Sequence, residues 1–236
     1  VHPQNNMALQ YYYDLMSQPS RAVYMILRLN KIPYEDRQVA LRKGEHRTED
    51  FTTKVNPFQL VPAIDDNGFR LTESIAIVEY LMNTRKLADH WYPPHTDPKR
   101  RARVTEYLHW QHFNTRGNCA SLFQYLLIIP RATGKPVDQT KVTQGRESVR
   151  KVIKNLESYF LRDTPFISSD VITAADIFGA CELMQLYAVL EENLYESSPI
   201  VKAWMERVRQ ETNPVFDDAH KIVYRVRDMY KGMAKL

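Results

Sequence analysis

The sequence predicts an α/β domain followed by an all-α domain. Strand-type and helix-type apolar patterns alternate up to about residue 84 in the order β-α-β-α-β-β-α, which fits a mixed four-stranded sheet with helices packed on it. Beyond Pro98 the strand signals nearly vanish and apolar residues recur with helical spacing. With 236 residues, of which 44% are hydrophobic, the chain is long enough to bury both cores.

The first element is a strand that runs directly into a helix. The aromatic residues Tyr11 to Tyr13 favour a strand, and Pro19 is allowed in a first helical turn. Because the first amides of a helix lack intrahelical partners and the helix dipole adds to them, this helix start attracts an anion. Ser17 stands at this point, where its hydroxyl either caps the helix or donates to a bound anion.

The following segments complete the α/β domain. Asn67-Gly68 is a strong hairpin signal, so the segments on either side of it are predicted to pair as antiparallel strands. The predicted elements are a strand over residues 34–39, a polar loop over 43–47, a short helix over 48–55, strands over 61–65 and 69–71, and a helix that opens at Thr72-Glu73-Ser74 and reaches Met82.

The rest of the chain is predicted to be a linker and a set of helices. In the linker, Trp91 and Tyr92 are expected to anchor a proline-rich stretch. Thr173 and Asp176 have the spacing of a capping box at a helix start. Helices are predicted over residues 100–129, 138–162, 174–191, 199–212 and 215–229, separated by prolines and one glycine.

Charge, cysteine content and apolar runs exclude several classes of protein. The net charge is +4 but the basic residues are scattered, so nucleic acid is not an expected partner. Cys119 and Cys181 form no metal-type cluster, and His90 and His95 lack further ligands at useful spacing, so no metal is expected. No apolar run approaches the roughly 18 residues of a membrane span, and no signal-peptide pattern is present, so a cytoplasmic protein is predicted.

Five motifs and the order of the elements together resemble the cytosolic glutathione transferases, theta class, of the insect or vertebrate type. The likeness runs from Ala8 to Arg227, so it covers both domains. Residues 1–7 precede it and are expected to be a tag remnant or a disordered tail. The motifs are Asp14 to Tyr24, Lys43 to His46, Val55 to Pro57, Leu71 to Ser74, and Ala102 to Leu108.

The resemblance implies a fold and an activity. It implies a thioredoxin-like glutathione-binding domain over residues 8–84, a linker over 85–98 and an all-α domain over 99–236 that contributes the electrophile site. The enzyme would bind glutathione as co-substrate, hold no other cofactor tightly, and conjugate the thiolate to small hydrophobic electrophiles in detoxification. Peroxidase and dehalogenating activities remain open. A homodimer is implied, with contacts near Phe58 and the helix from Arg100.

The resemblance also assigns residues to the two substrates. Ser17 is the expected catalytic residue, which stabilises the thiolate. Carbon electrophiles are expected between the domains, against Trp110, Phe113, Arg116 and Met229. The glutathione contacts are Gln18 beside the thiol, His46 and Arg47 near the glycyl carboxylate, the Val61 backbone at the cysteinyl part, a cis Pro62, and Glu73 with Ser74 at the γ-glutamyl end.

Two departures and three alternatives accompany this assignment. Leu60 stands where a lysine is often found, and Phe113 where some members carry an aspartate that crosses the dimer. Tyr13 competes with Ser17, because other classes of the family use a tyrosine near the end of the first strand. A non-catalytic interaction module is the alternative from another functional class. A thiol oxidoreductase would require a cysteine at Ser17.

Overall fold

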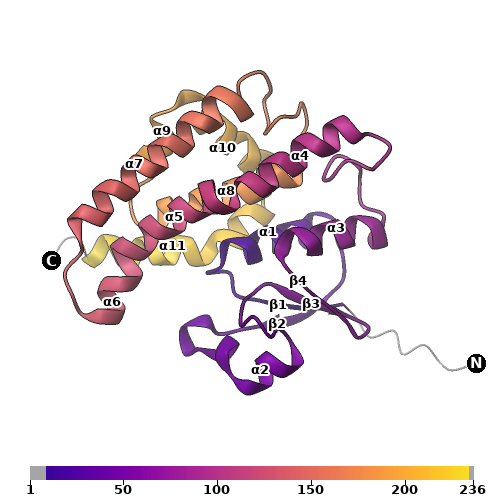
Figure 1. The fold of residues 1–236 in the computed structure, drawn as a ribbon, viewed down its shortest axis with the longest axis horizontal. Coiled ribbons are helices and arrows are strands. Elements are labelled where there is room, and N and C mark those ends of the chain that lie inside the picture. The colour runs from indigo at the N-terminus through magenta and orange to yellow at the C-terminus, as the bar shows by residue number, and fades with distance from the viewer. Residues whose placement is uncertain (1–8, 234–236) are drawn as a thin grey trace, which may run out of the picture. The chain divides into compact units, whose positions relative to one another are not determined.

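A computed structural model describes residues 9–233 and confirms the predicted fold class (Figure 1). The predicted tail, residues 1–7, lies outside the described residues. The chain divides between Leu87 and Ala88 into two compact units. We call them the α/β unit and the helical unit.

The α/β unit contains a mixed four-stranded sheet in the order β2-β1-β3-β4. Strand β1 pairs parallel with β2 and antiparallel with β3, and β3 pairs antiparallel with β4. Within this unit, Figure 1 shows α1 and α3 on one face of the sheet and α2 on the other. The elements are β1 (Gln10–Tyr13), α1 (Gln18–Leu29), β2 (Glu35–Gln38), α2 (Glu49–Lys54), β3 (Ala63–Asp66), β4 (Phe69–Thr72) and α3 (Ser74–Arg85).

The tyrosines of β1 show why this segment forms an inner strand. Tyr11 and Tyr13 point to the same face and are buried, and their rings stack with centroids 4.6 Å apart. Tyr12 points to the opposite face, where it packs against the cluster formed by Val39, Phe51 and Val61. Each face of the strand therefore buries aromatic surface, as alternation with a period of two requires. The predicted polar loop is wrong in one respect, because it folds into two 3-10 turns, Leu41–Lys43 and Glu45–Arg47.

The helical unit contains eight α-helices among the described residues. The short helix α9 was not predicted from the sequence, because four residues are too few for a periodic pattern. The helices are α4 (Pro98–Trp110), α5 (Gly117–Phe123), α6 (Ile129–Thr133), α7 (Gln139–Asn155), α8 (Ala174–Ala188), α9 (Asn193–Glu196), α10 (Pro199–Thr212) and α11 (Val215–Met233).

The predicted single helix over residues 100–129 is a longer, interrupted one. Two π-helical turns, His112–Arg116 and Gln124–Ile128, separate α4, α5 and α6, and a third, Leu156–Phe160, follows α7. Pro130 was predicted to end the helix but lies in the first turn of α6, where a missing N–H costs little. The helix ends instead at Gly134, whose φ of 68° suits a left-handed cap.

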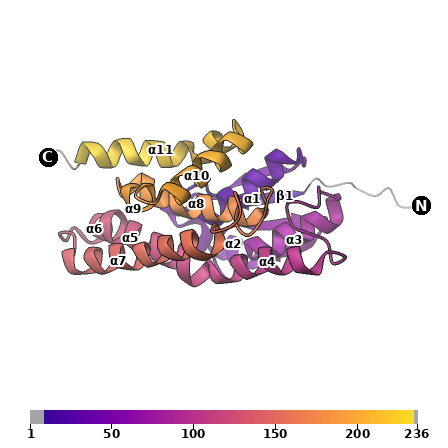
Figure 2. The ribbon, with the colours of Figure 1, turned by 90° about the horizontal axis from the view of Figure 1, so that it is seen from above.

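Helix α8 lies at the centre of the helical unit. All of its residues except Tyr187 are buried, and Figure 2 shows it between α10 and α11 on one side and α4, α5 and α7 on the other. The predicted capping box at its start is confirmed: the Thr173 amide donates to Asp176 at 2.8 Å, and the Thr173 side chain accepts in return. Asp176 also accepts from the Trp204 indole N–H at 2.8 Å, which fastens α10 to α8.

The linker is fastened to the helical unit by its aromatic residues. Trp91 and Tyr92 are buried, and His90 Nδ1 lies 2.8 Å from the Ile172 carbonyl oxygen. Across residues 9–233, no group of three or more His, Cys, Asp or Glu side chains is placed to hold a metal ion. No helix in the same residues is long and apolar enough to cross a membrane. The cytoplasmic location stays a prediction.

Candidate functional site

The strand register brings the predicted glutathione contacts to one edge of the sheet. Tyr12 lies opposite Ala63, and Ala63 lies opposite Thr72. The chain that follows β1, the chain that precedes β3 and the chain that follows β4 therefore meet at the same edge. These three connections carry Ser17, then Val61 with Pro62, then Glu73 with Ser74.

Ser17 is the N-cap of α1 and is half-buried. Its Oγ accepts a hydrogen bond from the Ser20 amide at 3.3 Å and donates to the Val61 carbonyl at 3.4 Å. The capping interpretation is therefore correct. The hydroxyl of Ser17 also has a proton to donate, which capping does not use. Both contacts are long for hydrogen bonds. An anion placed at the helix start could accept the hydrogen bond of the Ser17 hydroxyl in place of the Val61 carbonyl.

The Val61-Pro62 peptide bond is cis, as predicted. Both residues are buried, and the loop before them is held by Asn56, which is 1% exposed. Asn56 accepts from the Phe58 amide at 2.9 Å and donates to the Leu60 carbonyl at 2.8 Å. The loop that delivers Val61 to the site is thus fixed by one buried amide side chain. Leu60 itself is 58% exposed, so it offers an apolar surface at the position where the resemblance implies a lysine.

Glu73 adopts a backbone conformation that is unusual for a side-chain-bearing residue. Its φ is 66° and its ψ is 110°, and it occupies the N-cap position of α3. Among the described residues its carboxylate makes no capping hydrogen bond, so simple capping does not account for an acidic residue here. Non-glycine residues in sparsely populated conformations cluster at functional sites. The next residue, Ser74, is buried at the first turn of α3, where the helix amides are available to an anion.

His46 and Arg47 lie on the second 3-10 turn. The His46 Nδ1 atom is buried and has no hydrogen-bond partner within residues 9–233. Burial, with a smaller contribution from Arg47, lowers the pKa of His46 below its ordinary value, while Asp14 opposes this effect. The lowered pKa favours the neutral imidazole of His46, and Arg47 is the exposed cation of the pair.

Tyr13 is poorly placed to replace Ser17. Its ring is buried, stacked on Tyr11 and packed 5.7 Å from the Tyr24 ring. Burial raises the pKa of Tyr13 well above its ordinary value, and a hydrogen bond to Asp36 adds to the rise. A phenol held in this way is part of the core of the sheet.

Arg116 lies in an ion pair that is largely buried, because its carboxylate partner has no exposed side-chain surface. Its Nε donates to Glu182 at 2.7 Å, and Glu182 is fully buried on α8. Its Nη1 lies 3.1 Å from His112 Nδ1. The remaining amino group, Nη2, is buried and has no hydrogen-bond partner in the described part of the chain. The guanidinium is thus held in place on two sides and has one donor group to spare.

The other three predicted electrophile contacts have separate surroundings in the helical unit. Trp110 packs its ring on Phe160 with centroids 4.9 Å apart, and Phe113 is 90% exposed. Met229 on α11 accepts from Arg131 at 3.0 Å. These contacts do not link Trp110, Phe113, Arg116 and Met229 to one another, and their shared role stays a prediction.

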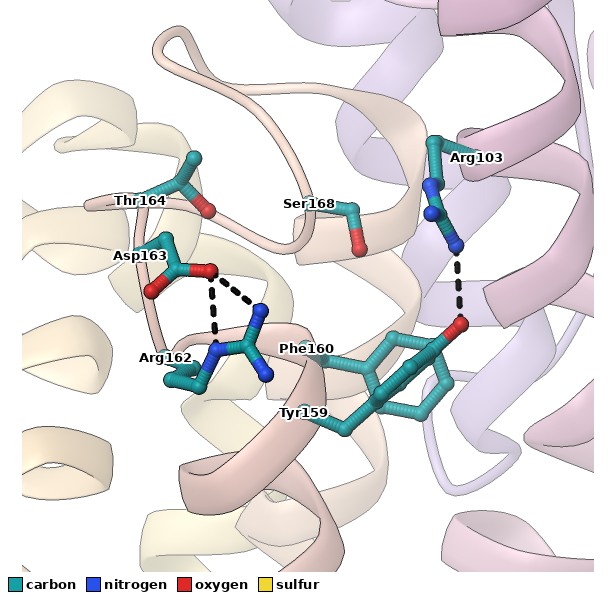
Figure 3. A pocket seen from close by; sticks show the side chains of 7 residues that line it. All are labelled: Arg103, Tyr159, Phe160, Arg162, Asp163, Thr164 and Ser168. Carbon is teal, nitrogen blue, oxygen red and sulfur yellow. Dashed lines mark hydrogen bonds and ion pairs between the residues drawn. The ribbon is translucent and has the colours of Figure 1, made fainter.

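A cavity of about 180 Å³ opens on the helical unit, and none of the residues assigned from the sequence is among those that line it (Figure 3). Its charged side chains are already paired: Arg103 donates to Tyr159 and Glu106, each at 2.8 Å, and Arg162 donates to Asp163 at 2.8 Å. This pairing argues against a strong anion site. Its lining consists of Arg103, Tyr159, Phe160, Arg162, Asp163, Thr164 and Ser168.

Sequence reasoning missed three residues that shape the site. Asp14 and Arg21 hold the turn that carries Ser17, and Glu182 holds Arg116. Asp14 had one usable signal, since it is a carboxylate placed directly between the strand and the predicted catalytic residue, Ser17. Arg21 and Glu182 had no usable sequence signal, because charged side chains in helices are rarely fully buried.

Both units match known protein families. The family described as "Glutathione S-transferase, N-terminal domain" matches residues 7–83, and "Glutathione S-transferase, C-terminal domain" matches residues 119–211. Among individual proteins, glutathione S-transferase theta-1 of Bos taurus is 38% identical over 94% of this chain and 91% of its own length. Glutathione S-transferase theta-2 of Mus musculus is 44% identical over 86% of this chain and 81% of its own length.

Solved structures agree with these relatives. The apo form of human glutathione-S-transferase T1-1 has a TM-score of 0.88 and 36% identity, with 93% of this chain and 91% of that chain covered. A human theta-class glutathione transferase in complex with the glutathione conjugate of 1-menaphthyl sulfate has a TM-score of 0.89 and 36% identity, with coverage of 97% and 92%.

Proposed function

Because the chain belongs to the theta class of the glutathione S-transferase family, which conjugates glutathione to electrophiles, we propose that Ser17 stabilises the reacting thiolate. Glutathione loses its thiol proton on binding. The thiolate then attacks an electrophilic carbon, so that a sulfur–carbon bond forms and the leaving group departs with its electron pair. The charge on sulfur is what the protein must stabilise before attack.

The observation that carries the proposal is the position of the Ser17 hydroxyl. It lies at the N-terminus of α1 and next to the Val61 carbonyl, at the edge of the sheet where three connections meet. A thiolate there would receive a hydroxyl hydrogen bond and the favourable end of the helix dipole. The buried, stacked Tyr13 offers neither.

The rest of glutathione is assigned by its chemistry. Glutathione is an extended tripeptide with two carboxylates, one ammonium and one thiol. The Val61 backbone would pair with the cysteinyl part, and Ser74 with the first amides of α3 suits the γ-glutamyl carboxylate. The Glu73 carboxylate, which makes no capping hydrogen bond, suits the ammonium group. Gln18 would donate beside the thiol, and His46 with Arg47 would hold the glycyl carboxylate.

Arg116 is assigned to the electrophile. The spare Nη2 group of a guanidinium fixed by Glu182 is a preorganised donor for charge that develops on a leaving group. Trp110, Phe113 and Met229 are assigned to the apolar part of the same substrate.

Turnover across a panel of electrophiles tests the function. The purified protein with glutathione should form thioethers from an aralkyl halide, an aralkyl sulfate ester and an activated alkene, measured by absorbance and by mass. An organic hydroperoxide in the same panel tests peroxidase activity. No turnover on any member would favour the non-catalytic interaction module, and absence of glutathione binding would contradict the proposed transferase.

We also propose a homodimer. Phe58 is an aromatic side chain that is 68% exposed on the single chain, and two-fold dimers are the commonest homo-oligomers. Light scattering at micromolar protein should give twice the 27.7 kDa of one chain. Phe58→Ser should shift the protein toward the monomer, whereas Phe69→Ser, at a residue 49% exposed on the hairpin, serves as the matched control. A monomer mass for the wild type would contradict the dimer.

A further inference from the structure

The carboxylate of Asp14 joins two segments of the proposed glutathione site. Asp14 follows the last residue of β1 and is half-buried. Its Oδ1 accepts from the Met16 amide at 2.8 Å, within the turn that leads to Ser17. Its Oδ2 accepts from the Leu41 amide at 3.1 Å, at the start of the 3-10 turns. One side chain therefore holds both the turn before Ser17 and the amide of Leu41, which lies 27 positions after Asp14 in the sequence.

A buried arginine braces the same turn from the helix side. Arg21 on α1 is fully buried, and its Nη1 donates to the Leu15 carbonyl at 2.8 Å and to the Met16 carbonyl at 3.3 Å. The Ser17 amide donates to the Asp14 carbonyl at 2.9 Å. The turn before Ser17 is thus held by Asp14 through its amides and by Arg21 through its carbonyls. A Ser17 side chain carried on this turn has little freedom to move.

The Leu41 end of the bridge leads to the glycyl-end residues. After Leu41 the chain forms the two 3-10 turns that contain His46 and Arg47. These turns are mostly exposed, with no buried residue in either one. Asp14 also favours the protonated form of His46, although burial and Arg47 lower the pKa of His46 by more. The bridge from Asp14 to the Leu41 amide is accordingly a link between this exposed segment and the sheet edge.

We propose that Asp14 is a positioning residue that couples the thiol end of the glutathione site to its glycyl end. The inference rests on the proposed function, because it takes Ser17 as the thiolate-stabilising residue and His46 with Arg47 as the carboxylate contacts. With both bonds in place, the distance between the two ends is set before glutathione binds. Binding then costs less ordering of the 41–47 segment, and the thiol arrives beside Ser17 in register.

Replacing Asp14 with asparagine breaks one half of the bridge. An amide side chain has the same shape but only one acceptor oxygen, so it cannot accept from both the Met16 and Leu41 amides. Asp14→Asn is expected to weaken binding of S-methylglutathione, which lacks an ionisable thiol, by about tenfold, since a hydrogen bond to a charged acceptor is lost. The KM for glutathione should rise by a similar factor, and amide exchange of residues 41–47 should become faster.

Three variants separate coupling from general damage. Asp50→Asn is the matched control, because it removes an equally negative, exposed carboxylate of the α/β unit that pairs with Lys54. It should leave the affinity for S-methylglutathione, the KM for glutathione and the amide exchange of residues 41–47 unchanged. Asp14→Glu keeps the charge and both acceptor oxygens and should restore part of the affinity. In the double variant with Ser17→Ala, the loss of turnover should be smaller than the product of the two single losses, because the two residues act as a unit.

The proposed function and the coupling role of Asp14 would be contradicted by different results. If the wild type neither binds nor turns over glutathione, the proposed function fails. If the wild type does so and Asp14→Asn matches Asp50→Asn in affinity and in exchange of residues 41–47, the coupling role is wrong. Lowered thermal stability of Asp14→Asn with unchanged affinity would also overturn it, because that pattern describes a residue that only supports the fold.

Discussion

Ser17→Ala is expected to raise the apparent pKa of the thiol of bound glutathione by at least about 1 unit and to cut turnover on the order of tenfold or more. Lowering a thiol pKa by about 2 units from its usual value near 8.5 requires roughly 2.7 kcal/mol in favour of the thiolate. A hydroxyl that donates to a charged acceptor supplies about 1.5 to 3 kcal/mol, and a helix N-terminus adds about 0.3 to 1. The variant loses the first contribution and keeps the second.

Tyr13→Phe is the matched control for this prediction. It removes one hydroxyl from the end of the first strand while keeping a ring that can stack on Tyr11. Titration of the thiolate absorbance of bound glutathione should give a pKa close to that of the wild type. A shift in Tyr13→Phe without one in Ser17→Ala would overturn the serine assignment. Ser17→Ala also loses the N-cap of α1, which costs about 0.5 to 2 kcal/mol of stability and is measured separately by thermal unfolding.

Arg116→Ala is expected to lower the free energy of unfolding by about 3 to 5 kcal/mol, because it removes the cation that pairs with a buried carboxylate. Glu182 is fully buried and receives the Arg116 Nε–H at 2.7 Å. Chemical denaturation of the two proteins measures the difference. Arg116→Ala alone would therefore mix a stability effect with any catalytic one.

Arg116→Lys separates the two effects. A lysine keeps a positive charge for Glu182 but lacks the planar fork that presents a second donor group. If Nη2 faces the leaving group, kcat should fall on the order of ten- to a hundredfold while the KM for glutathione stays nearly unchanged. The control is Arg146→Lys, which alters another arginine–glutamate pair of the helical unit, Arg146 with Glu191, at a residue with no assigned role. An unchanged kcat in Arg116→Lys would assign Arg116 to structure alone.

Local sequence signals were sufficient wherever the interaction that fixes the structure is itself local. Asn67-Gly68 gave the hairpin, since its two positive φ values are ones these residues accept readily. Thr173 and Asp176 gave the start of α8 through a capping box that spans three residues. The cis bond at Pro62 was implied by the family resemblance, and the structure has it.

The features that sequence reasoning could not supply depend on distant parts of the chain. Arg116 and Glu182 are 66 positions apart, and no periodic pattern links them. Arg21 is fully buried in a helix whose other buried residues are mostly apolar, so its burial follows from carbonyls that only the folded turn presents. The π-helical turn at His112–Arg116 escaped prediction because one extra residue per turn hardly disturbs helical spacing over five residues.

The positions of the two cysteines have a consequence for the durability of the enzyme. Cys119 and Cys181 are both 0% exposed, and burial together with the charge of Glu182 raises the pKa of Cys119 well above its ordinary value. Sulfur attacks electrophiles as the thiolate, and a buried thiol of raised pKa is seldom ionised. Neither cysteine thiol is therefore exposed to the electrophiles that a transferase of this family conjugates, and burial limits alkylation of the protein's own cysteines during turnover.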